Sequence, residues 1–280
     1  MWRHLHCNHL YFKMKAKYYL KNSIDYINKE LLRRSSYDIF INEIKELNKS
    51  YNYSIYLYGS YIGYLIEQKP YNDINFIILS EKILEQLKPY IHNAKYIQLH
   101  GVGEPTLSPS FWKALEVLNN NTWSSTNTNL VNLSDEKMIK LVNSSLKHLS
   151  ISIDSPNIET YYKIRGTNLN NVIENIKKLM SYKEEHNSNL ILTLNMTLMR
   201  ENILELKDAI DLCVNLNINT LDTWPLNNWE GEHFNRNIRN WNFNYEDQLP
   251  WKFKELYNSE LDKTSIYANE KNVKFTYHKL

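Results

Sequence analysis

From residue 81 to residue 224 the sequence alternates between short apolar segments and segments with apolar residues at helical spacing, and this alternation constrains the fold most strongly. Strand–helix units of this length favour a parallel sheet covered by helices, either doubly wound or rolled into a barrel. Polar residues fall at or just after the ends of several strands, as they do in β/α barrels. We therefore expect an α/β fold, and a partial or complete β/α barrel fits the sequence better than a doubly wound sheet. The expected strands are 54–58, 74–79, 96–100, 122–126, 148–153, 190–197 and 220–224, and the expected helices are 81–90, 109–119, 135–145, 169–185 and 203–215.

Three regions are expected along the chain. Residues 1–50 are polar and carry apolar residues at roughly helical spacing, which predicts an N-terminal helical extension. Residues 51–230 are expected to form the barrel. Residues 231–280 hold Trp241 and Trp251 in an aromatic-rich tail, which we expect to pack on the barrel or to present a surface to a protein partner.

The overall composition excludes several functions. The 33 basic and 31 acidic residues nearly balance, so the total charge gives no reason to expect nucleic acid as a partner. No apolar run is long enough to span a bilayer, and the two cysteines, Cys7 and Cys213, lie far apart, so we expect a cytoplasmic protein without disulfides. His4, His6 and His9 beside Cys7 lack a second ligand pair, so no metal site is predicted there.

The first candidate site lies in residues 96–112, where an apolar strand stops at glycines and a helix follows. Gly101 and Gly103 allow a tight turn and leave space beside the carboxylate of Glu104, which Pro105 follows. Such a space can admit the ammonium group of a ligand. A tight connection without any function would have the same pattern, so both interpretations stay open here.

Several linked motifs resemble those of the radical S-adenosylmethionine (radical SAM) enzymes. The segment Gly101-Val-Gly-Glu-Pro105 resembles their Gly-Gly-Glu-Pro motif, which receives the amino group of S-adenosylmethionine (SAM). Ser125-Thr-Asn-Thr128 resembles the Thr-Asn-Gly of the next strand. Ser150-Ile-Ser-Ile-Asp-Ser155, followed by Ile164-Arg165-Gly166, resembles a later strand and the helix after it. The resemblance covers residues 54–229 and implies a partial (β/α)6 barrel of the radical SAM type, close to its SPASM branch.

The family holds a [4Fe-4S] cluster on a Cys-x3-Cys-x2-Cys loop after the first strand, and this chain departs from that pattern. The loop after Tyr58 reads Gly-Ser-Tyr-Ile-Gly-Tyr-Leu-Ile-Glu and contains no cysteine. The run that begins at Cys7 places Tyr11 and Met14 where the second and third cysteines would stand, and both are poor substitutes for thiolates. We therefore expect no [4Fe-4S] cluster, and the radical reaction that depends on it should be lost.

Without the cluster, the resemblance implies that the remaining motifs bind SAM or a similar small ligand. Asp154 has an alternative role as a helix cap, Asn127 as a turn former, and Arg165 as a surface or interhelical charge. The residues that the resemblance assigns to the ligand are Gly101, Gly103, Glu104, Pro105, Asn127, Ser152, Asp154 and Asn195.

Three functions follow from these observations. The preferred one is a pseudoenzyme, a radical SAM-like barrel that binds SAM or a similar ligand without turning it over. The second is a non-catalytic partner or scaffold subunit of a biosynthetic or modification complex, with the Trp-rich tail as its interface. The third is an enzyme of a non-radical reaction class that uses Glu104, Asp154 or His100 as acid or base in the inherited site.

Overall fold

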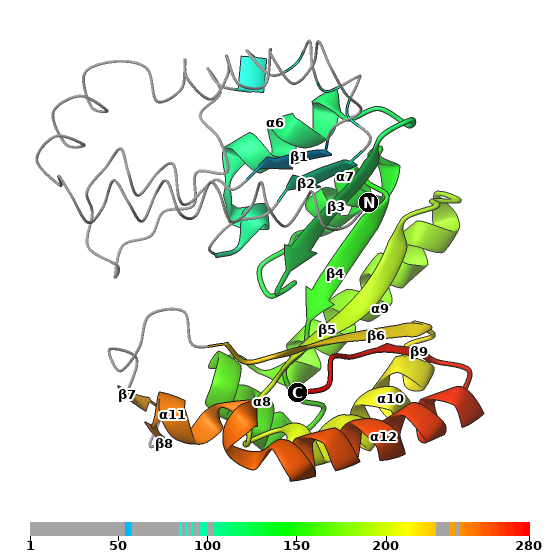
Figure 1. The fold of residues 1–280 in the computed structure, drawn as a ribbon. Helices are drawn as coiled ribbons and strands as arrows, with labels where there is room; N and C mark the ends of the chain where they lie inside the picture. The colour runs from blue at the N-terminus through cyan, green and yellow to red at the C-terminus, as the bar shows by residue number, and fades with distance from the viewer. Residues whose placement is uncertain are drawn as a thin grey trace, which may run out of the picture.

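The computed structural model describes residues 54–57, 84, 85, 88, 91, 94, 96–99, 103–227, 236–238 and 241–280, and the structural statements below concern these residues (Figure 1). The N-terminal extension expected at 1–50, the strand expected at 74–79, His100 and Gly101 lie outside them. Within the described ranges, none of the helices is both long enough and apolar enough to cross a bilayer.

Seven described strands form one sheet, and every neighbouring pair is parallel. The first six follow each other in chain order, and the sheet stays open between its two edge strands, so the expected open β/α architecture is confirmed. The seventh strand comes from the C-terminal tail and was not predicted. The strands are β1 (Ser54–Leu57), β2 (Tyr96–Leu99), β3 (Trp123–Thr128), β4 (His148–Ser152), β5 (Ile191–Leu198), β6 (Thr220–Pro225) and β9 (Lys274–Thr276).

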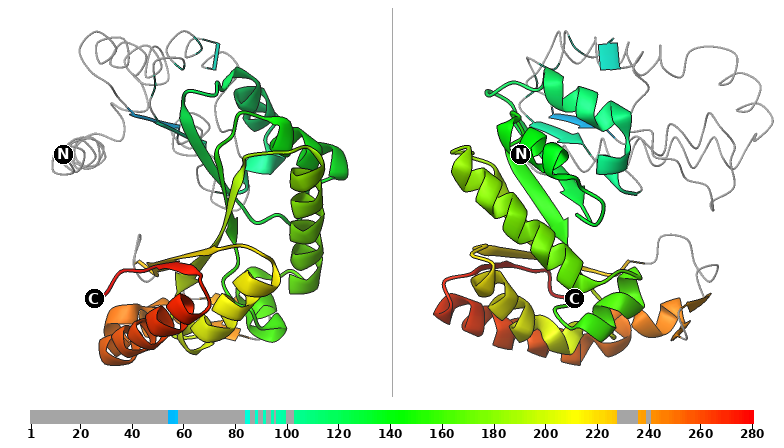
Figure 2. Two further views of the ribbon diagram at one scale, coloured as in Figure 1. Left: turned by 90° about the vertical axis from the view of Figure 1, so that its right-hand side faces the viewer. Right: turned by 180° about the vertical axis from the view of Figure 1, so that it is seen from behind.

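Helices cover one side of the curved sheet (Figures 1 and 2). Along the chain, α7 packs against α9, and α10 packs against α12 from the tail. A short antiparallel hairpin stands apart from the main sheet. The helices are α6 (Pro109–Val117), α7 (Asp135–Asn143), α8 (Ile158–Arg165), α9 (Leu169–Glu185), α10 (Leu206–Asn215), α11 (Tyr245–Gln248) and α12 (Lys254–Glu270); the 3-10 turns are η1 (Pro105–Leu107), η2 (Ile203–Glu205) and η4 (Pro250–Phe253); the hairpin strands are β7 (Arg236–Ile238) and β8 (Trp241–Phe243).

Helix α8 shows how the local sequence sets the element boundaries near the site. Asn157 caps its N-terminus, because the Asn157 side chain accepts hydrogen bonds from the backbone N–H groups of Glu159 and Thr160. Gly166 ends the helix in the left-handed region, at φ 74°. The alternative role of Asp154 as the cap is therefore wrong: it lies three residues too early, and its carboxylate has other partners.

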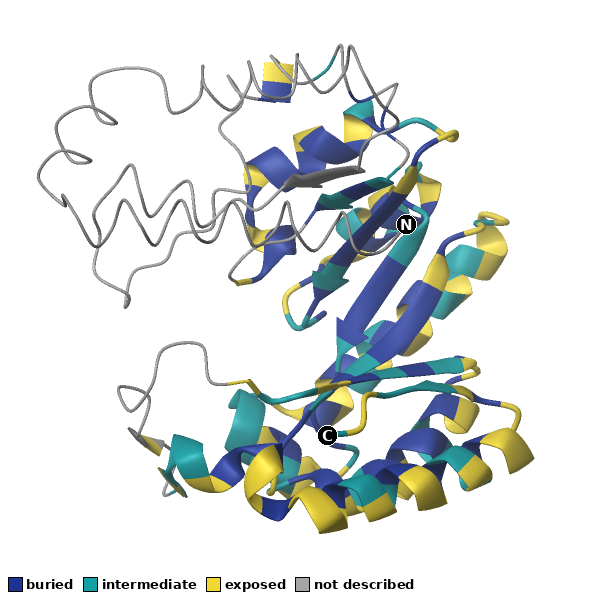
Figure 3. Ribbon diagram, in the orientation of Figure 1, coloured by how far each residue is buried: buried dark blue, intermediate teal, exposed yellow. Residues whose placement is uncertain are grey.

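The two faces of the sheet differ sharply, because side chains alternate along each strand. One face is buried under the helices and is mostly apolar, and it includes Leu149, Ile151, Leu194, Met196 and Leu221. Figure 3 draws most residues of β4 and β5 as buried. Residues at the alternate positions are mostly polar and partly exposed. The polar face is therefore the side of the sheet on which a ligand-binding site can be built.

Candidate functional site

The loop after β2 folds around the carboxylate of Glu104. Gly103 has φ 115°, a value that glycine adopts far more readily than other residues. Glu104 Oε1 accepts hydrogen bonds from the backbone N of Thr106 (3.2 Å), from Thr106 Oγ1 (2.6 Å) and from Thr128 Oγ1 (2.7 Å), while Oε2 accepts one from the backbone N of Asn129 (2.6 Å). Pro105 begins η1 directly after it. Glu104 is only 8% exposed and joins this loop to the end of β3.

These contacts limit what Glu104 can offer to a ligand. A carboxylate has about four acceptor positions, two on each oxygen, and three donors already crowd Oε1. Oε2 has a single donor within the described residues. An ammonium group would therefore meet Glu104 at Oε2.

Asp154, the second predicted acid, is committed to structural contacts. Its Oδ1 accepts a hydrogen bond from the backbone N of Thr197 at 2.8 Å, and its Oδ2 lies 2.6 Å from Arg165 Nε in an ion pair. Its backbone oxygen accepts a hydrogen bond from Asn202 Nδ2 at 2.7 Å. Burial lowers the pKa of Arg165, but the charge and hydrogen bonding of Asp154, together with the charges of Tyr161 and Glu104, raise it overall. Asp154 thus fastens the ends of β4, β5 and α8 together.

Ser152 and Asn195 are brought side by side on the polar face. Ser152 is in register with Asn195, Asn195 with Asp222, and Asp222 with Thr276, so these four residues form one row across β4, β5, β6 and β9. Residues in register on parallel strands share a face. Asn127 is half-buried and pairs with Ser150, one row nearer the amino ends of the strands. Of the predicted residues, Ser152 and Asn195 therefore meet directly, and Asn127 lies apart from them.

Asp222 is the polar-face residue that the sequence analysis missed. It occupies an alternate position of β6, between Leu221 and Thr223, which are buried, and two residues before Trp224. Residues two apart in a strand share a face, so the sequence could have predicted that Asp222 and Trp224 lie on the same face of β6. The charge of Asp222 also reaches His148, whose Nε2 lies 2.9 Å from Thr193 Oγ1.

His148 shows how its neighbours act on a half-buried imidazole. Burial lowers its pKa, the negative charge of Asp222 opposes that effect, and the positive charge of Lys274 adds to it. His148 stands at the first position of β4, at the amino end of the strand. Active sites of β/α barrels lie at the carboxyl ends of the strands, so we assign His148 to the scaffold.

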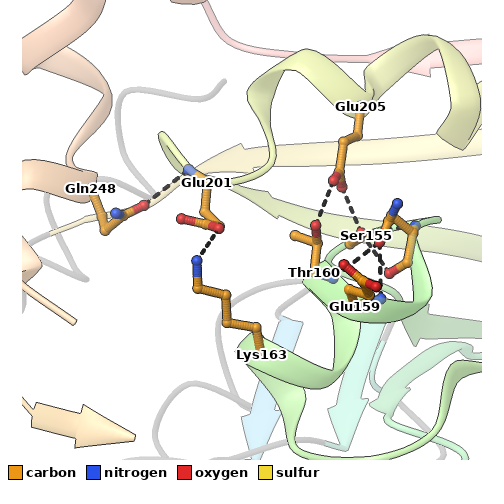
Figure 4. Close-up of polar contacts among 8 residues, drawn as sticks. Ser155, Glu159, Thr160, Lys163, Glu201, Glu205 and Gln248 are labelled. Atoms are coloured by element: carbon orange, nitrogen blue, oxygen red, sulfur yellow. Dashed lines mark hydrogen bonds and ion pairs between the residues drawn. The ribbon is translucent and has the colours of Figure 1, made fainter. Parts of the chain in front are cut away.

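The tail is attached near the carboxyl ends of β4 and β5 (Figure 4). Glu205 accepts hydrogen bonds from Ser155 Oγ (2.5 Å) and Thr160 Oγ1 (2.7 Å), and burial raises the pKa of Glu205. In the same region Lys163 pairs with Glu201, whose backbone N donates to the Gln248 side chain at 3.0 Å. These contacts connect α8, the segment after β5 and α11 of the tail.

The cysteines bear directly on iron binding. Cys213 lies inside α10, is fully buried, and burial raises the pKa of its thiol to about 12. Among the described residues there is also no group of three His, Cys, Asp or Glu side chains that could hold a metal ion. Cys7 and the loop after β1 lie outside the described residues.

Comparison with known proteins gives both a family and a set of similar folds. A model of the radical SAM superfamily matches residues 68–213, just over half of the chain. None of the curated proteins searched matches significantly. SuiB from Streptococcus suis is similar in fold, with TM-score 0.55 and 14% identity over 96% of this chain and 60% of SuiB. SuiB bound to S-adenosylmethionine gives TM-score 0.56 and 14% identity over 95% and 61%. The structure of anSMEcpe with bound AdoMet and Cp18Cys peptide gives TM-score 0.52 and 16% identity over 71% and 56%.

These similarities establish the fold and the superfamily, while membership of the SPASM branch stays a prediction. This chain spans only about 60% of the length of SuiB, so the activity of a whole SuiB-like protein is not transferred to it. The family match covers the segment that contains Glu104, Ser152 and Asn195 and the sheet from β2 to β5. On this evidence, the chain belongs to the radical SAM superfamily.

Proposed function

We propose that this protein is a radical SAM pseudoenzyme that binds S-adenosylmethionine, or a similar small ligand with an ammonium group, without cleaving it. The observation that carries the proposal is the state of its cysteines. The chain has two, and one of them, Cys213, is fully buried among core residues of α10.

A [4Fe-4S] cluster is held by the thiolates of several accessible cysteines, three of them in the loop that this family uses. Cys213 is fully buried inside α10, so its thiol is not accessible to a cluster, and burial also raises its pKa to about 12. Cys7 alone cannot supply three thiolates. The residues present therefore do not fit the cluster, and we assign no step to it. The cysteine content also fits a reducing compartment, in keeping with a cytoplasmic location.

The residues present do fit a bound SAM molecule. Oε2 of Glu104 has one donor among the described residues, so its second acceptor position suits an ammonium group, which donates hydrogen bonds to carboxylates. Ser152 and Asn195, in register on β4 and β5, offer hydroxyl and amide groups for a ribose. Asp154 contributes indirectly, because its contacts with Thr197 and Arg165 hold the strand ends in place.

Calorimetry with two ligands tests the proposal without disturbing Glu104. SAM carries an ammonium and a carboxylate, and 5′-methylthioadenosine has the same nucleoside without either. We expect SAM to bind at least tenfold more tightly, because only SAM reaches Oε2 of Glu104. Asn195→Ala should weaken both ligands, whereas Asn143→Ala, on the exposed end of α7, should weaken neither. No heat with SAM, or equal affinity for the two ligands, would contradict the proposal.

A further inference from the structure

Asp222 is a half-buried carboxylate without a bonding partner in the described part of the chain. It accepts none of the hydrogen bonds there and forms none of the ion pairs, although it stands on β6 between two hydrogen-bonded neighbours, β5 and β9. Partial burial of a charge is unfavourable unless the charge is paired. The charges of Asp222 and Lys274 both act on the His148 imidazole, and Lys274 lies one row nearer the amino ends of the strands than Asp222. The carboxylate of Asp222 thus has room for a further cationic partner.

Trp224 lies on the same face, two residues nearer the carboxyl end of β6. It is 52% exposed, so one side of the indole is open to a ligand. The His278 ring lies against it, with centroids 4.5 Å apart and planes inclined by 32°. Because Thr276 is in register with Asp222, the tail brings His278 beside Trp224. An aromatic surface therefore adjoins the carboxylate.

We propose that Asp222 and Trp224 form a binding site for a primary amine that carries a flat apolar group. The ammonium would pair with the Asp222 carboxylate, and the flat group would stack on the exposed indole, supported by the attraction between cations and aromatic rings. Asn195, in register with Asp222, provides an amide next to the ammonium. The site adjoins the proposed SAM site and shares Asn195 with it, and its binding of an amine does not depend on SAM.

Two probes with the same ring and opposite charge test the site in the full chain without SAM. These are 2-phenylethylamine and 3-phenylpropionate, with binding followed by calorimetry. We expect the amine to bind at least fivefold more tightly than the acid. Asp222→Asn should remove this preference, and Trp224→Leu should weaken both probes by about fivefold.

Matched control variants distinguish binding at this site from nonspecific binding elsewhere on the protein. Asp208→Asn changes an exposed carboxylate on α10, on the helical side of the sheet, and Trp123→Leu changes an exposed indole at the amino end of β3. Both variants should bind the amine like the wild type. Equal binding of the amine and the acid, unchanged binding in Asp222→Asn, or an equal loss in the control variants would each overturn the proposal. Because SAM is absent, a failure here would leave the SAM proposal standing, and the reverse also holds.

Discussion

Replacing Glu104 by Gln tests whether this residue organises the loop or only offers a carboxylate to a ligand. The change keeps the size of the side chain and replaces one oxygen by an NH₂ group. If the remaining oxygen faces Thr106 and Thr128, the new NH₂ group faces the backbone N–H of Asn129, and two donors then oppose each other. Turning the amide over places the NH₂ group against the backbone N–H of Thr106 and leaves the two threonine hydroxyls without their acceptor. Either orientation costs hydrogen bonds that the carboxylate makes.

The size of the effect follows from the least adaptable donor. The threonine hydroxyls can rotate toward other acceptors, but the backbone N–H groups of Asn129 and Thr106 cannot, and each orientation of the amide leaves one of these two donors facing the NH₂ group. Leaving such a donor unsatisfied costs about 1 to 3 kcal/mol, so we expect Glu104→Gln to lower the free energy of unfolding by about 2 kcal/mol. With a urea m value of about 3 kcal/mol/M, the unfolding midpoint should fall by roughly 0.7 M.

Urea unfolding followed by far-ultraviolet circular dichroism measures this midpoint. Glu116→Gln is the matched control, because Glu116 is an exposed glutamate of α6 whose ion pair with Lys140 is also exposed, and its midpoint should hardly move. If Glu104→Gln unfolds at the same urea concentration as the wild type, the four hydrogen bonds do not stabilise the loop and our reasoning about Glu104 is refuted.

Three further predictions concern the surroundings of the site. Asp154→Asn should cost about 2 kcal/mol in urea unfolding, less than a fully buried pair because Arg165 is partly exposed, and a double-mutant cycle with Arg165→Met should show positive coupling; strict additivity would argue against the pair. The raised pKa of Glu205 means that the folded chain holds this proton more tightly than the unfolded chain, so its contribution to stability is present below pH 4.5 and is lost as the pH rises through the raised value. In thermal melts over this pH range, Glu205→Gln should therefore lose less stability than the wild type as the pH rises. Parallel plots of melting temperature against pH for the two proteins would contradict this. In a Cys7→Ser variant, native Cys213 should not react with a thiol reagent at pH 8 until the protein is unfolded, and rapid native labelling would show that it is accessible.

The sequence predicted the architecture well, because that part depends on local periodicity. Apolar residues alternate with polar ones along most of β4 and β5, and this period of two marks both strands and the face that carries Ser152 and Asn195. Strand β9 was not predicted because its three residues are too few to show a periodic pattern. It is held in the sheet by pairing with β6, a contact between segments about fifty residues apart.

The chemistry of the candidate site was harder to predict, because it depends on distant partners. Nothing near Glu104 in sequence indicates that Thr128 and Asn129, more than twenty residues later, would occupy its carboxylate. Asp154 was likewise expected to face a ligand or cap a helix, whereas its partner is Arg165, which α8 brings back toward the end of β4. Asp222 was overlooked because a single acid inside a strand has no motif around it.

Iron analysis combined with a test of SAM cleavage examines the central claim most directly. The full chain should be reconstituted anaerobically with iron and sulfide, desalted, and incubated with SAM and a strong reductant such as dithionite. We predict less than one tenth of the iron and sulfide needed for one [4Fe-4S] cluster per chain, and recovery of SAM intact. Four irons and four sulfides per chain, with SAM converted to 5′-deoxyadenosine and methionine, would contradict the account.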